Sequence, residues 1–408
     1  MIKTYGENLV RQAESIIDEQ VARGVILEAG SVVENTDIGS EEDGISSLTL
    51  NISDDCQLNC RYCFADGGSY GVCSESPMMS SEVMRAAVDL LRQVGNRNKI
   101  SIVFFGGEPL LNWPLMKECV EYSRSVLSDH VSKLYYSVTT NAIGLDDEKV
   151  AYMRENMIVP LVSIDGTGEV HNSLRPMKNS TLDSLEHTLA GLRKLVNAGF
   201  DYIRIRATET AYSEPLQEYI DYYSSSENIS RFNFQPIVCS RESDMYLDSI
   251  SLNRFEAEAV DLVLRGGLDI DPLGTYIDRI RRKHRRTHFC AMGSRTAVVT
   301  VNGDVYPCHR IAGVDEFRFG NVLSPSHIDF ASMKSIVENL GVDNLRECNS
   351  CWMRYICGGT CYGENYSENG DLSRVFSVRC HMIKKIIYAS IEKVLMELHP
   401  RDEAVTSK

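Results

Sequence analysis

The chain has 408 residues, 43% of them hydrophobic, and a formal net charge of −15. This length suits two or three domains of about 100–200 residues each, and the negative charge argues against non-specific binding to nucleic acid or to anionic membranes. No apolar run reaches the roughly 18 residues of a membrane span, and the first residues lack the apolar segment of a secretion signal. We therefore expect a cytoplasmic protein with neither a nucleic-acid nor a membrane partner.

The first half of the chain alternates between strand and helix patterns. Residues 6–27 predict an amphipathic helix, and 35–44 predict a polar linker. The candidate strands that follow are Ser47–Ile52, Ile100–Phe105, Leu134–Thr140, Val159–Ile164, Tyr202–Ala207 and Arg231–Gln235. Helical patterns fill the gaps at Ser80–Val94, Pro114–Leu127, Asp146–Glu155, Ser180–Ala198 and Glu214–Tyr223. Six β-α units with short buried strands predict a parallel sheet.

The second half has a connecting segment, a hairpin and a last helix. Residues 250–289 predict connecting helices. We interpret the basic run Arg279–Arg286 within them as a solvated helix face; the alternative is that it binds a peptide or a phosphate. Asn302-Gly303 predicts a hairpin with a type I′ turn. The last helix is predicted over Met382–Leu398, followed by a frayed tail.

Thirteen cysteines in a chain without a secretion signal favour metal binding over disulfides. Ten of them fall in two clustered regions, and Cys73, Cys119 and Cys239 are scattered. We expect Cys119 to be a buried hydrophobic residue and Cys73 to be a free thiol.

The first cysteine cluster, Cys56, Cys60 and Cys63, follows the first predicted strand at the spacing C-x3-C-x2-C. A [4Fe-4S] cluster normally takes four thiolates, so three leave one iron without a protein ligand. S-adenosylmethionine (SAM) can chelate that iron through its amino and carboxylate groups. A zinc knuckle is the alternative, although zinc usually needs a fourth ligand nearby. The spacing, with Tyr62 before the third cysteine, resembles the signature loop of the radical SAM superfamily, in which the reduced cluster cleaves SAM to a 5′-deoxyadenosyl radical.

Residues at the ends of later strands would form the SAM pocket. Gly106-Gly107-Glu108-Pro109 follows the second strand and resembles the superfamily's GGE(P) motif, which binds the methionine amino group; two glycines also let the backbone approach a ligand closely. The resemblance places ribose contacts at Ser163 and Asp165, with Asn141 nearby. Arg206 could pair with the methionine carboxylate, but Arg204 points the same way and a structural ion pair is equally plausible. Chemistry at strand ends fits a six-stranded partial (β/α)6 TIM barrel, which the resemblance also implies.

Seven further cysteines form the second cluster: Cys290, Cys308, Cys348, Cys351, Cys357, Cys361 and Cys380. They exceed what one cluster or one zinc ion can use, whereas two [4Fe-4S] clusters would need eight ligands. The pattern resembles the SPASM domain, an auxiliary-cluster extension of radical SAM enzymes that mature peptides and proteins. A zinc ribbon built from the four cysteines between 348 and 361 is the alternative, and it would leave three cysteines unused.

The resemblance implies an interleaved assignment of these ligands. The outer cluster would take Cys348, Cys351, Cys357 and Cys380, and the inner one Cys290, Cys308 and Cys361. Family members with a complete inner site have another cysteine six residues after the first, where this chain has Thr296. The inner cluster would then keep one open iron, unless Cys239 fills it, and could bind a substrate thiolate. The expected cofactors are SAM and three [4Fe-4S] clusters.

Local sequence indicates the subgroup. Tyr62-Cys63-Phe64-Ala65, Gly68–Gly71 and Val301–Arg310 resemble thioether-forming peptide maturases of the SCIFF, ranthipeptide and sactipeptide groups. Sulfatase-maturing enzymes carry an Asp where this chain has His309. We predict an enzyme that links a Cys sulfur to a carbon in a ribosomally synthesised precursor peptide. The alternatives are a carbon–carbon crosslink, epimerisation or formylglycine formation, and, as another class, a non-catalytic electron carrier. His309 is a candidate base for the incoming thiol, or a support for a cluster sulfur.

The predicted domains are an N-terminal helix and linker (1–45), the barrel (46–249), bridging helices (250–289), the SPASM domain (290–382), and a last helix and tail (383–408). Maturases of this kind often begin with a winged-helix domain that grips the leader of the precursor, and the first 45 residues are too few for one. The expected partners are a Cys-containing precursor peptide and a flavodoxin or ferredoxin as reductant. A separate leader-binding protein is a further expected partner if the enzyme does not bind the leader itself.

Overall fold

The computed structural model describes residues 44–71, 76–239, 242–267 and 269–398. The predicted helix over 6–27, Cys73 and the C-terminal tail lie outside these residues.

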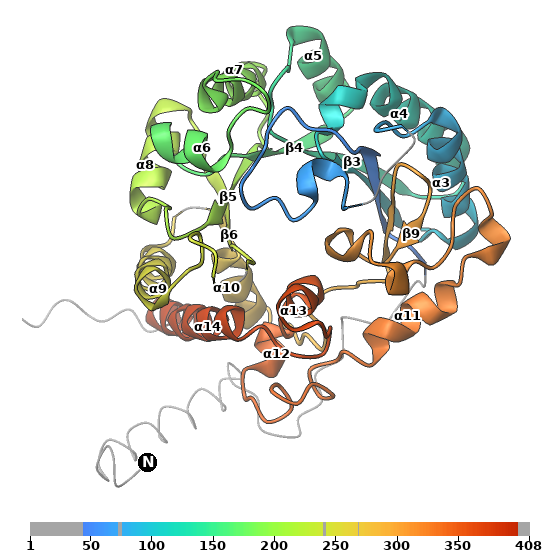
Figure 1. The fold of residues 1–408 in the computed structure, drawn as a ribbon. Coiled ribbons are helices and arrows are strands. Elements are labelled where there is room, and N and C mark those ends of the chain that lie inside the picture. The colour runs from blue at the N-terminus through green and yellow to red at the C-terminus, as the bar shows by residue number, and fades with distance from the viewer. Residues whose placement is uncertain (1–43, 72–75, 240–241, 268, 399–408) are drawn as a thin grey trace, which may run out of the picture.

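The six predicted strands are confirmed, and each pairs in parallel with the next (Figure 1). They form because buried apolar side chains alternate with more exposed ones. In β2, for example, Ile100, Ile102 and Phe104 are fully buried while the neighbouring Lys99 is exposed. The strands are β1 (Ser47–Ser53), β2 (Lys99–Gly106), β3 (Lys133–Thr140), β4 (Ile158–Ser163), β5 (Arg204–Glu209) and β6 (Arg231–Pro236).

Helices cover the outer side of these strands (Figure 1). They are α3 (Ser81–Val94), α4 (Trp113–Leu127), α5 (Asp147–Glu155), α6 (Gly168–Leu174), α7 (Ser184–Asn197) and α8 (Leu216–Ser226). Side chains of Ser80, Asp146 and Asp183 cap α3, α5 and α7 by accepting backbone N–H groups. The prediction of one helix over Ser180–Ala198 began too early, because the Asp183 cap starts α7 at Ser184 and the separate α6 precedes it.

The sheet extends beyond the six-stranded core at both edges. Within the described residues its order is β7-β6-β5-β4-β3-β2-β1-β8-β9. At one edge β7 (Asp269–Asp271) pairs with β6, and at the other β8 (Thr296–Val299) pairs in parallel with β1. The prediction of helices alone over 250–289 was therefore incomplete. It identified α9 (Ser249–Arg265) and α10 (Leu273–Arg281) but missed β7, whose three residues include only one buried apolar side chain.

The predicted hairpin is present, with a different turn. β9 (Val305–Tyr306) runs antiparallel to β8. Gly303 N donates to Thr300 O at 2.9 Å, so the turn spans residues 300–303. Gly303 is the last residue of this turn and has a φ of 87°. A type I′ turn centred on Asn302-Gly303 would need a positive φ at both residues, and Asn302 does not have one.

The cysteine-rich segment packs around its own small core, which includes Tyr306, Val337 and Tyr362. Its helices are η3 (His309–Ile311), η4 (Asp315–Phe317), η5 (Pro325–His327), α11 (Phe330–Glu338), α12 (Arg354–Cys357) and α13 (Tyr362–Asn369). The last helix, α14 (Ser377–Leu398), begins earlier than predicted, so Cys380 lies in its first turn. It packs against α9 and α10 (Figure 1).

Much of the basic run is not a solvated helix face, which corrects that prediction. Arg279 Nη1 donates to the carbonyls of Ile356 and Cys357 at 2.9 and 2.8 Å, and Arg285 lies 3.8 Å from the ring centroid of Tyr355. The run therefore binds the connecting segment to α12. In the part of the chain that the structure describes, no helix is both long and apolar enough to span a membrane.

Candidate active site at the carboxyl ends of the strands

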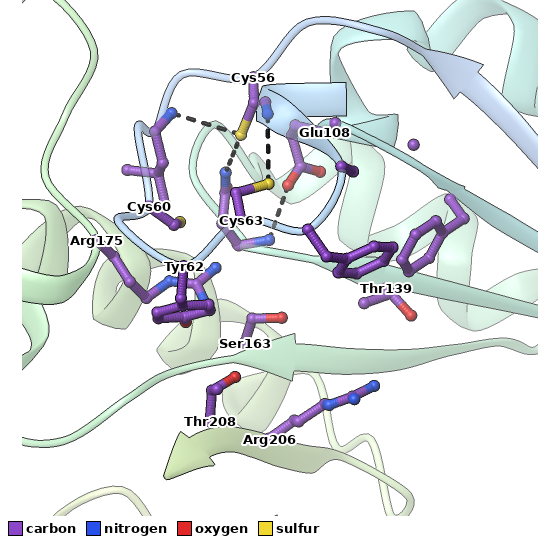
Figure 2. Close-up of a pocket in the computed structure, with 18 of the residues that line it drawn as sticks. Cys56, Cys60, Tyr62, Cys63, Glu108, Thr139, Ser163, Arg175, Arg206 and Thr208 are labelled. Atoms are coloured by element: carbon purple, nitrogen blue, oxygen red, sulfur yellow. Dashed lines mark hydrogen bonds between the residues drawn. The ribbon is translucent and has the colours of Figure 1, made fainter. Parts of the chain in front are cut away.

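One pocket lies at the carboxyl ends of the parallel strands, where the loop after β1 faces the ends of β4 and β5 (Figure 2). Its lining comes from the loop after β1, from the ends of β2 to β6, and from His309 and Arg310 of the cysteine-rich segment. The sequence-predicted residues that line it are Cys56, Cys60, Tyr62, Cys63, Gly106, Gly107, Glu108, Asn141, Ser163, Arg206 and His309. Pro109 and Asp165 do not line it.

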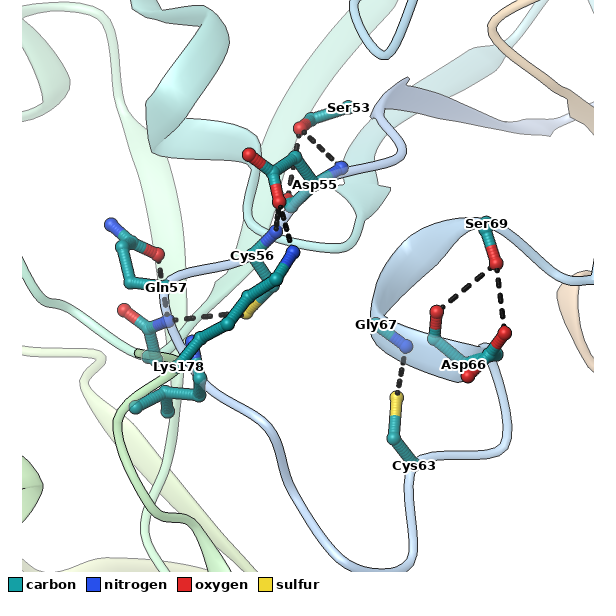
Figure 3. A network of polar contacts seen from close by, with 11 residues as sticks. Ser53, Asp55, Cys56, Gln57, Cys63, Asp66, Gly67, Ser69 and Lys178 are labelled. Atoms are coloured by element: carbon teal, nitrogen blue, oxygen red, sulfur yellow. Dashed lines mark hydrogen bonds and ion pairs between the residues drawn. The ribbon is translucent and has the colours of Figure 1, made fainter. Parts of the chain in front are cut away.

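The cysteine loop is held by backbone and side-chain hydrogen bonds (Figure 3). Cys56 N donates to Asp55 Oδ1 at 2.9 Å, and Lys178 Nζ binds the same oxygen at 2.8 Å. Two sulfurs accept backbone N–H groups: Cys56 Sγ from Leu58, and Cys63 Sγ from Gly67. Such bonds favour the thiolate form.

Burial alone acts against that thiolate form. It raises the pKa of Cys56 to about 12 and the pKa of Cys60 to about 11. A thiol of this kind stays protonated at neutral pH unless a metal replaces its proton. Among the described residues, no three Cys, His, Asp or Glu side chains are close enough to hold a single metal ion. The loop cysteines share one pocket, and a cluster binds each thiolate through a different iron. The donor set therefore fits an iron–sulfur cluster.

Gly106, the last residue of β2, and Gly107, which follows it, are required by packing. Gly107 N donates to Ser53 O at 2.7 Å, and a Cβ on Gly107 would lie 2.5 Å from Gly67 O, with Asp55 O closer still. The end of β2 therefore lies directly against the cysteine loop, and a side chain at Gly107 would force the two apart.

The Glu108 carboxylate is fully buried beneath the pocket. Its Oε1 accepts hydrogen bonds from Leu110 N at 3.0 Å and from the Thr140 hydroxyl at 2.7 Å, and its Oε2 accepts from Asn141 N at 2.8 Å. Burial raises the pKa of Glu108 to about 7. A carboxylate offers about four acceptor sites, so these three bonds leave one for a ligand ammonium.

Asp165, which is predicted to contact the ribose, does not line the pocket, and its carboxylate contacts other residues of the chain. Its Oδ1 accepts from Thr208 N at 2.8 Å, and its Oδ2 contacts the Tyr62 hydroxyl and Arg175 Nη1. Burial raises the pKa of Asp165, while Arg175 opposes that shift. Ser163 and Thr208 remain as hydroxyls facing the pocket (Figure 2).

Arg175 is a pocket residue that the sequence did not reveal. It is only 9% exposed, and its Nη1 donates to the Tyr62 hydroxyl at 2.9 Å. No motif marks it, because it follows α6 more than a hundred residues after Tyr62.

The choice between the two arginines of β5 is resolved by their neighbours. Arg204 pairs with Asp269 of β7 at 3.0 Å, away from the pocket. Arg206 lines the pocket, and burial and the nearby Arg310 lower its pKa to about 10. Asn141 Nδ2 donates to Gln57 Oε1 at 3.2 Å, which places this amide beside the cysteine loop.

The C-terminal cysteines fall into two groups, defined by which thiols act electrostatically on one another. Cys308 and Cys361 act on Cys290, and we call these three the inner group. The outer group is Cys348, Cys351, Cys357 and Cys380. Burial raises the pKa of Cys308 and of Cys357 to about 12. These groups have the same members as the two ligand sets that the family resemblance implies, and the assignment of the ligands stays a prediction.

Two residues bear on the fourth position of the inner group. The Thr296 hydroxyl donates to the backbone carbonyls of Ala291 and Pro307, at 3.3 and 3.2 Å. Cys239 packs with a separate hydrophobic cluster that includes Ile237 and Met245. Cys119, by contrast, is fully buried among apolar side chains as predicted.

His309 lies between the barrel and the cysteine-rich domain. Its ring centroid is 5.0 Å from that of Phe105 and 5.8 Å from that of Phe64. Burial and the neighbouring Arg310 lower the pKa of His309 to about 3. These surroundings disfavour the protonated imidazolium, so His309 would be a weak base in its predicted role.

Comparison with known proteins agrees with this geometry. The model of the radical SAM superfamily matches residues 50–208, and that of the SPASM iron–sulfur cluster-binding domain matches 290–352. The chain is a radical SAM enzyme with a SPASM domain. The two domains account for SAM and [4Fe-4S] clusters as its cofactors.

Relatives of this enzyme differ in what they do. The radical SAM cyclopropyl synthase TigE of Paramaledivibacter caminithermalis is 24% identical over 86% of this chain and 74% of its own. The cysteine-type anaerobic sulfatase-maturating enzyme of Clostridium novyi is 22% identical over 86% of this chain and 96% of its own.

Solved structures share the fold. One is anSMEcpe with bound AdoMet, with a TM-score of 0.73 and 20% identity over 86% of this chain and 98% of that one. Another is Streptococcus suis SuiB bound to its precursor peptide SuiA, with a TM-score of 0.57 and 15% identity over 90% of this chain and 87% of that one.

Proposed function

We propose that this enzyme installs thioether links, from a Cys sulfur to a carbon, in a ribosomally synthesised precursor peptide. The observation that carries this proposal is the inner cysteine group. It supplies three thiols, and the hydroxyl of Thr296, which stands where a fourth cysteine would complete the set, is bonded to backbone carbonyls. Three thiolates leave one iron of a [4Fe-4S] cluster open. A substrate thiolate is a suitable ligand for that iron.

The residues around the pocket would hold SAM. Cys56, Cys60 and Cys63 would bind its cluster. The fourth acceptor site of Glu108 and nearby backbone carbonyls would bind the methionine ammonium, and Arg206 would bind the carboxylate by a charge-assisted bond. Ser163 and Thr208 would face the ribose. Asp165 and Arg175 act behind them, because they fix Tyr62 and the end of β5.

When bound, SAM and its cluster would supply hydrogen-atom abstraction from the acceptor carbon, and the auxiliary clusters would supply a thiolate site and an acceptor for one electron. The carbon–sulfur bond then forms with loss of the thiol proton to solvent. The proposal thus uses three clusters, one at the loop cysteines and one at each C-terminal group. A precursor peptide as substrate is supported by SuiB, which binds its precursor peptide SuiA. A flavodoxin or ferredoxin would supply electrons, and a separate protein could bind the leader.

A second candidate is a different peptide modification on the same scaffold: a carbon–carbon crosslink, epimerisation or formylglycine formation. The relatives named as a cyclopropyl synthase and as sulfatase-maturating enzymes favour this alternative. Against formylglycine stands His309, which occupies the position where sulfatase-maturing enzymes carry an Asp.

Mass spectrometry of a co-expressed precursor separates these functions. The probe is a small Cys-rich precursor peptide, to be sought first among the reading frames beside this gene. A thioether lowers its mass by two hydrogen atoms per link and makes one Cys per link unreactive to iodoacetamide. Fragmentation must then place the link on a Cys sulfur. A product with all its cysteines still alkylatable would refute the proposal, whatever other change its mass shows.

A further inference from the structure

Three arginines surround one buried carboxylate beside the pocket. Glu364 of α13 is only 1% exposed, and Arg379 of α14 occupies both of its oxygens, at 2.6 and 2.9 Å. Arg379 also donates to Gln235 Oε1 at 2.8 Å. This arginine is therefore fully paired, and the Glu364 charge is largely neutralised by it.

The other two arginines face the pocket with much less compensation. Arg310 reaches Glu364 Oε1 only at 3.4 Å, and its guanidinium lies 5.2 Å from the ring centroid of Phe64. The Arg206 side chain makes no hydrogen bond or ion pair within the residues that the structure describes, although Glu364 and Asp165 act on it electrostatically. Both line the pocket, and the Arg310 side chain is 14% exposed. A partly buried cation without a full partner is unfavourable, so the site favours anionic ligands.

Bound SAM would satisfy only one of these two cations. Its carboxylate is assigned to Arg206, its ammonium to Glu108, and Arg175 is already paired with Asp165. Arg310 remains without a full partner. It lies two residues after Cys308 of the inner group, beside the place proposed for the substrate sulfur.

We propose that Arg310 binds an acidic side chain, Asp or Glu, of the precursor peptide close to the Cys that donates sulfur. The proposal rests on the proposed function, since it presumes a peptide in this pocket. A guanidinium offers two parallel N–H donors that match the two oxygens of a carboxylate. A neutral amide in place of either group cannot make this charged pair. The competing role for Arg310 is to balance the thiolate charge of Cys308 and Cys361, on which it acts electrostatically.

The test measures peptide affinity of the anaerobically reconstituted holoenzyme with SAM bound. The probes are acetylated, fluorescently labelled peptides with one Cys and one Asp separated by glycine spacers of increasing length, in both orders. Each has a matched peptide with Asn in place of Asp, and fluorescence anisotropy gives Kd. The wild type should prefer Asp over Asn by about tenfold or more at one spacing. Arg310→Gln should abolish that preference, and Arg310→Lys, which keeps the charge, should retain part of it.

Controls separate binding from structural damage. Arg318→Gln removes an exposed arginine whose ion pair to Asp304 spans 3.8 Å, and it should keep the wild-type preference. Iron content and the electron paramagnetic resonance spectrum report whether Arg310→Gln still assembles its clusters.

Equal or unmeasurable affinity for both peptides at every spacing overturns the proposal. A preference that survives Arg310→Gln overturns it too, as does loss of auxiliary iron in both Arg310 variants, because that result assigns Arg310 to the cluster. The proposed function is tested separately, by the mass of the co-expressed precursor, so either idea can fail alone.

Discussion

Gly107→Ala tests whether the end of β2 and the cysteine loop are one packed unit. Gly107 has no positive φ, so backbone strain does not enter, and the effect of an added methyl group is steric. That methyl carbon would lie 2.5 Å from Gly67 O and 2.7 Å from the carbonyl carbon of Asp55. Both are backbone atoms, and they flank the three loop cysteines on either side. No side chain can rotate to make room, so the loop itself must move.

The expected cost follows from that geometry. Inserting a methyl group into a packed site typically costs about 1–3 kcal/mol, and the fixed backbone on two sides places this case toward the upper end. Because the displaced loop carries the proposed cluster ligands, SAM binding should weaken by about tenfold for each 1.4 kcal/mol of that cost. Equilibrium dialysis with labelled SAM and the denaturant midpoint measure the two effects.

Gly274→Ala is the matched control. Gly274 lies in α10, also without a positive φ, and a Cβ there would meet no atom within 4 Å. The midpoint of this variant should stay the same or rise slightly, because alanine favours a helix over glycine. If Gly107→Ala keeps the wild-type midpoint and SAM affinity, the loop does not lie against β2 as described.

Three further predictions address the clusters and the core. Replacing all three loop cysteines by alanine should abolish 5′-deoxyadenosine release under dithionite while iron analysis still finds the auxiliary iron; a variant that still cleaves SAM contradicts the proposed ligands. Thr296→Cys should fill the open inner position, so SAM cleavage continues but the crosslinked product disappears from the mass spectrum; undiminished crosslinking would rule out an open iron there. His171 is fully buried, and burial, then Arg175, lower its pKa to about 3. Below about pH 6.5 the unfolded state binds a proton on His171 that the folded state does not bind. The free energy of unfolding should therefore decrease as the pH is lowered, by up to about 1.4 kcal/mol per pH unit. Denaturant titrations at several pH values should show a smaller slope for His171→Asn than for the wild type. His187→Asn, at an exposed histidine, should keep the wild-type slope. A wild-type slope in His171→Asn would contradict the burial of His171.

The strands and helices of the barrel could be predicted from the sequence because each one is marked by a pattern within its own few residues. Each core strand is a short run whose apolar side chains alternate, and caps such as Asp146 and Asp183 mark helix starts within a few residues. The cysteine loop was equally accessible, since three cysteines at such close spacing are typical of a cluster ligand set. β7 was missed for the opposite reason: three residues with one buried side chain carry no periodic signal.

The site was only partly predictable because its decisive contacts join distant parts of the chain. Asp165 was expected at the ribose, yet its oxygens are taken by Tyr62, Arg175 and Thr208. Arg204 and Arg206 are equivalent by strand periodicity, and only Asp269 of the unpredicted β7 distinguishes them. Such pairings arise from tertiary packing, which no local pattern encodes.

The parallel pairing of β8 with β1 gives the two proposed reaction centres a fixed relation. Ser47 is paired with Thr296 and Leu50 with Val299, so the strand that enters the cysteine loop is hydrogen-bonded to the strand that follows Cys290. A tilted ring contact between His309 and Phe105, with centroids 5.0 Å apart, joins the same two regions. Hydrogen abstraction would need the acceptor carbon close to the SAM site, and bond formation would need it close to the substrate sulfur. A displacement of about 1 Å can cost a hundredfold in rate. A flexible linker could not hold that placement. The shared sheet can, which explains why the cysteine-rich segment continues the barrel instead of forming a separate module.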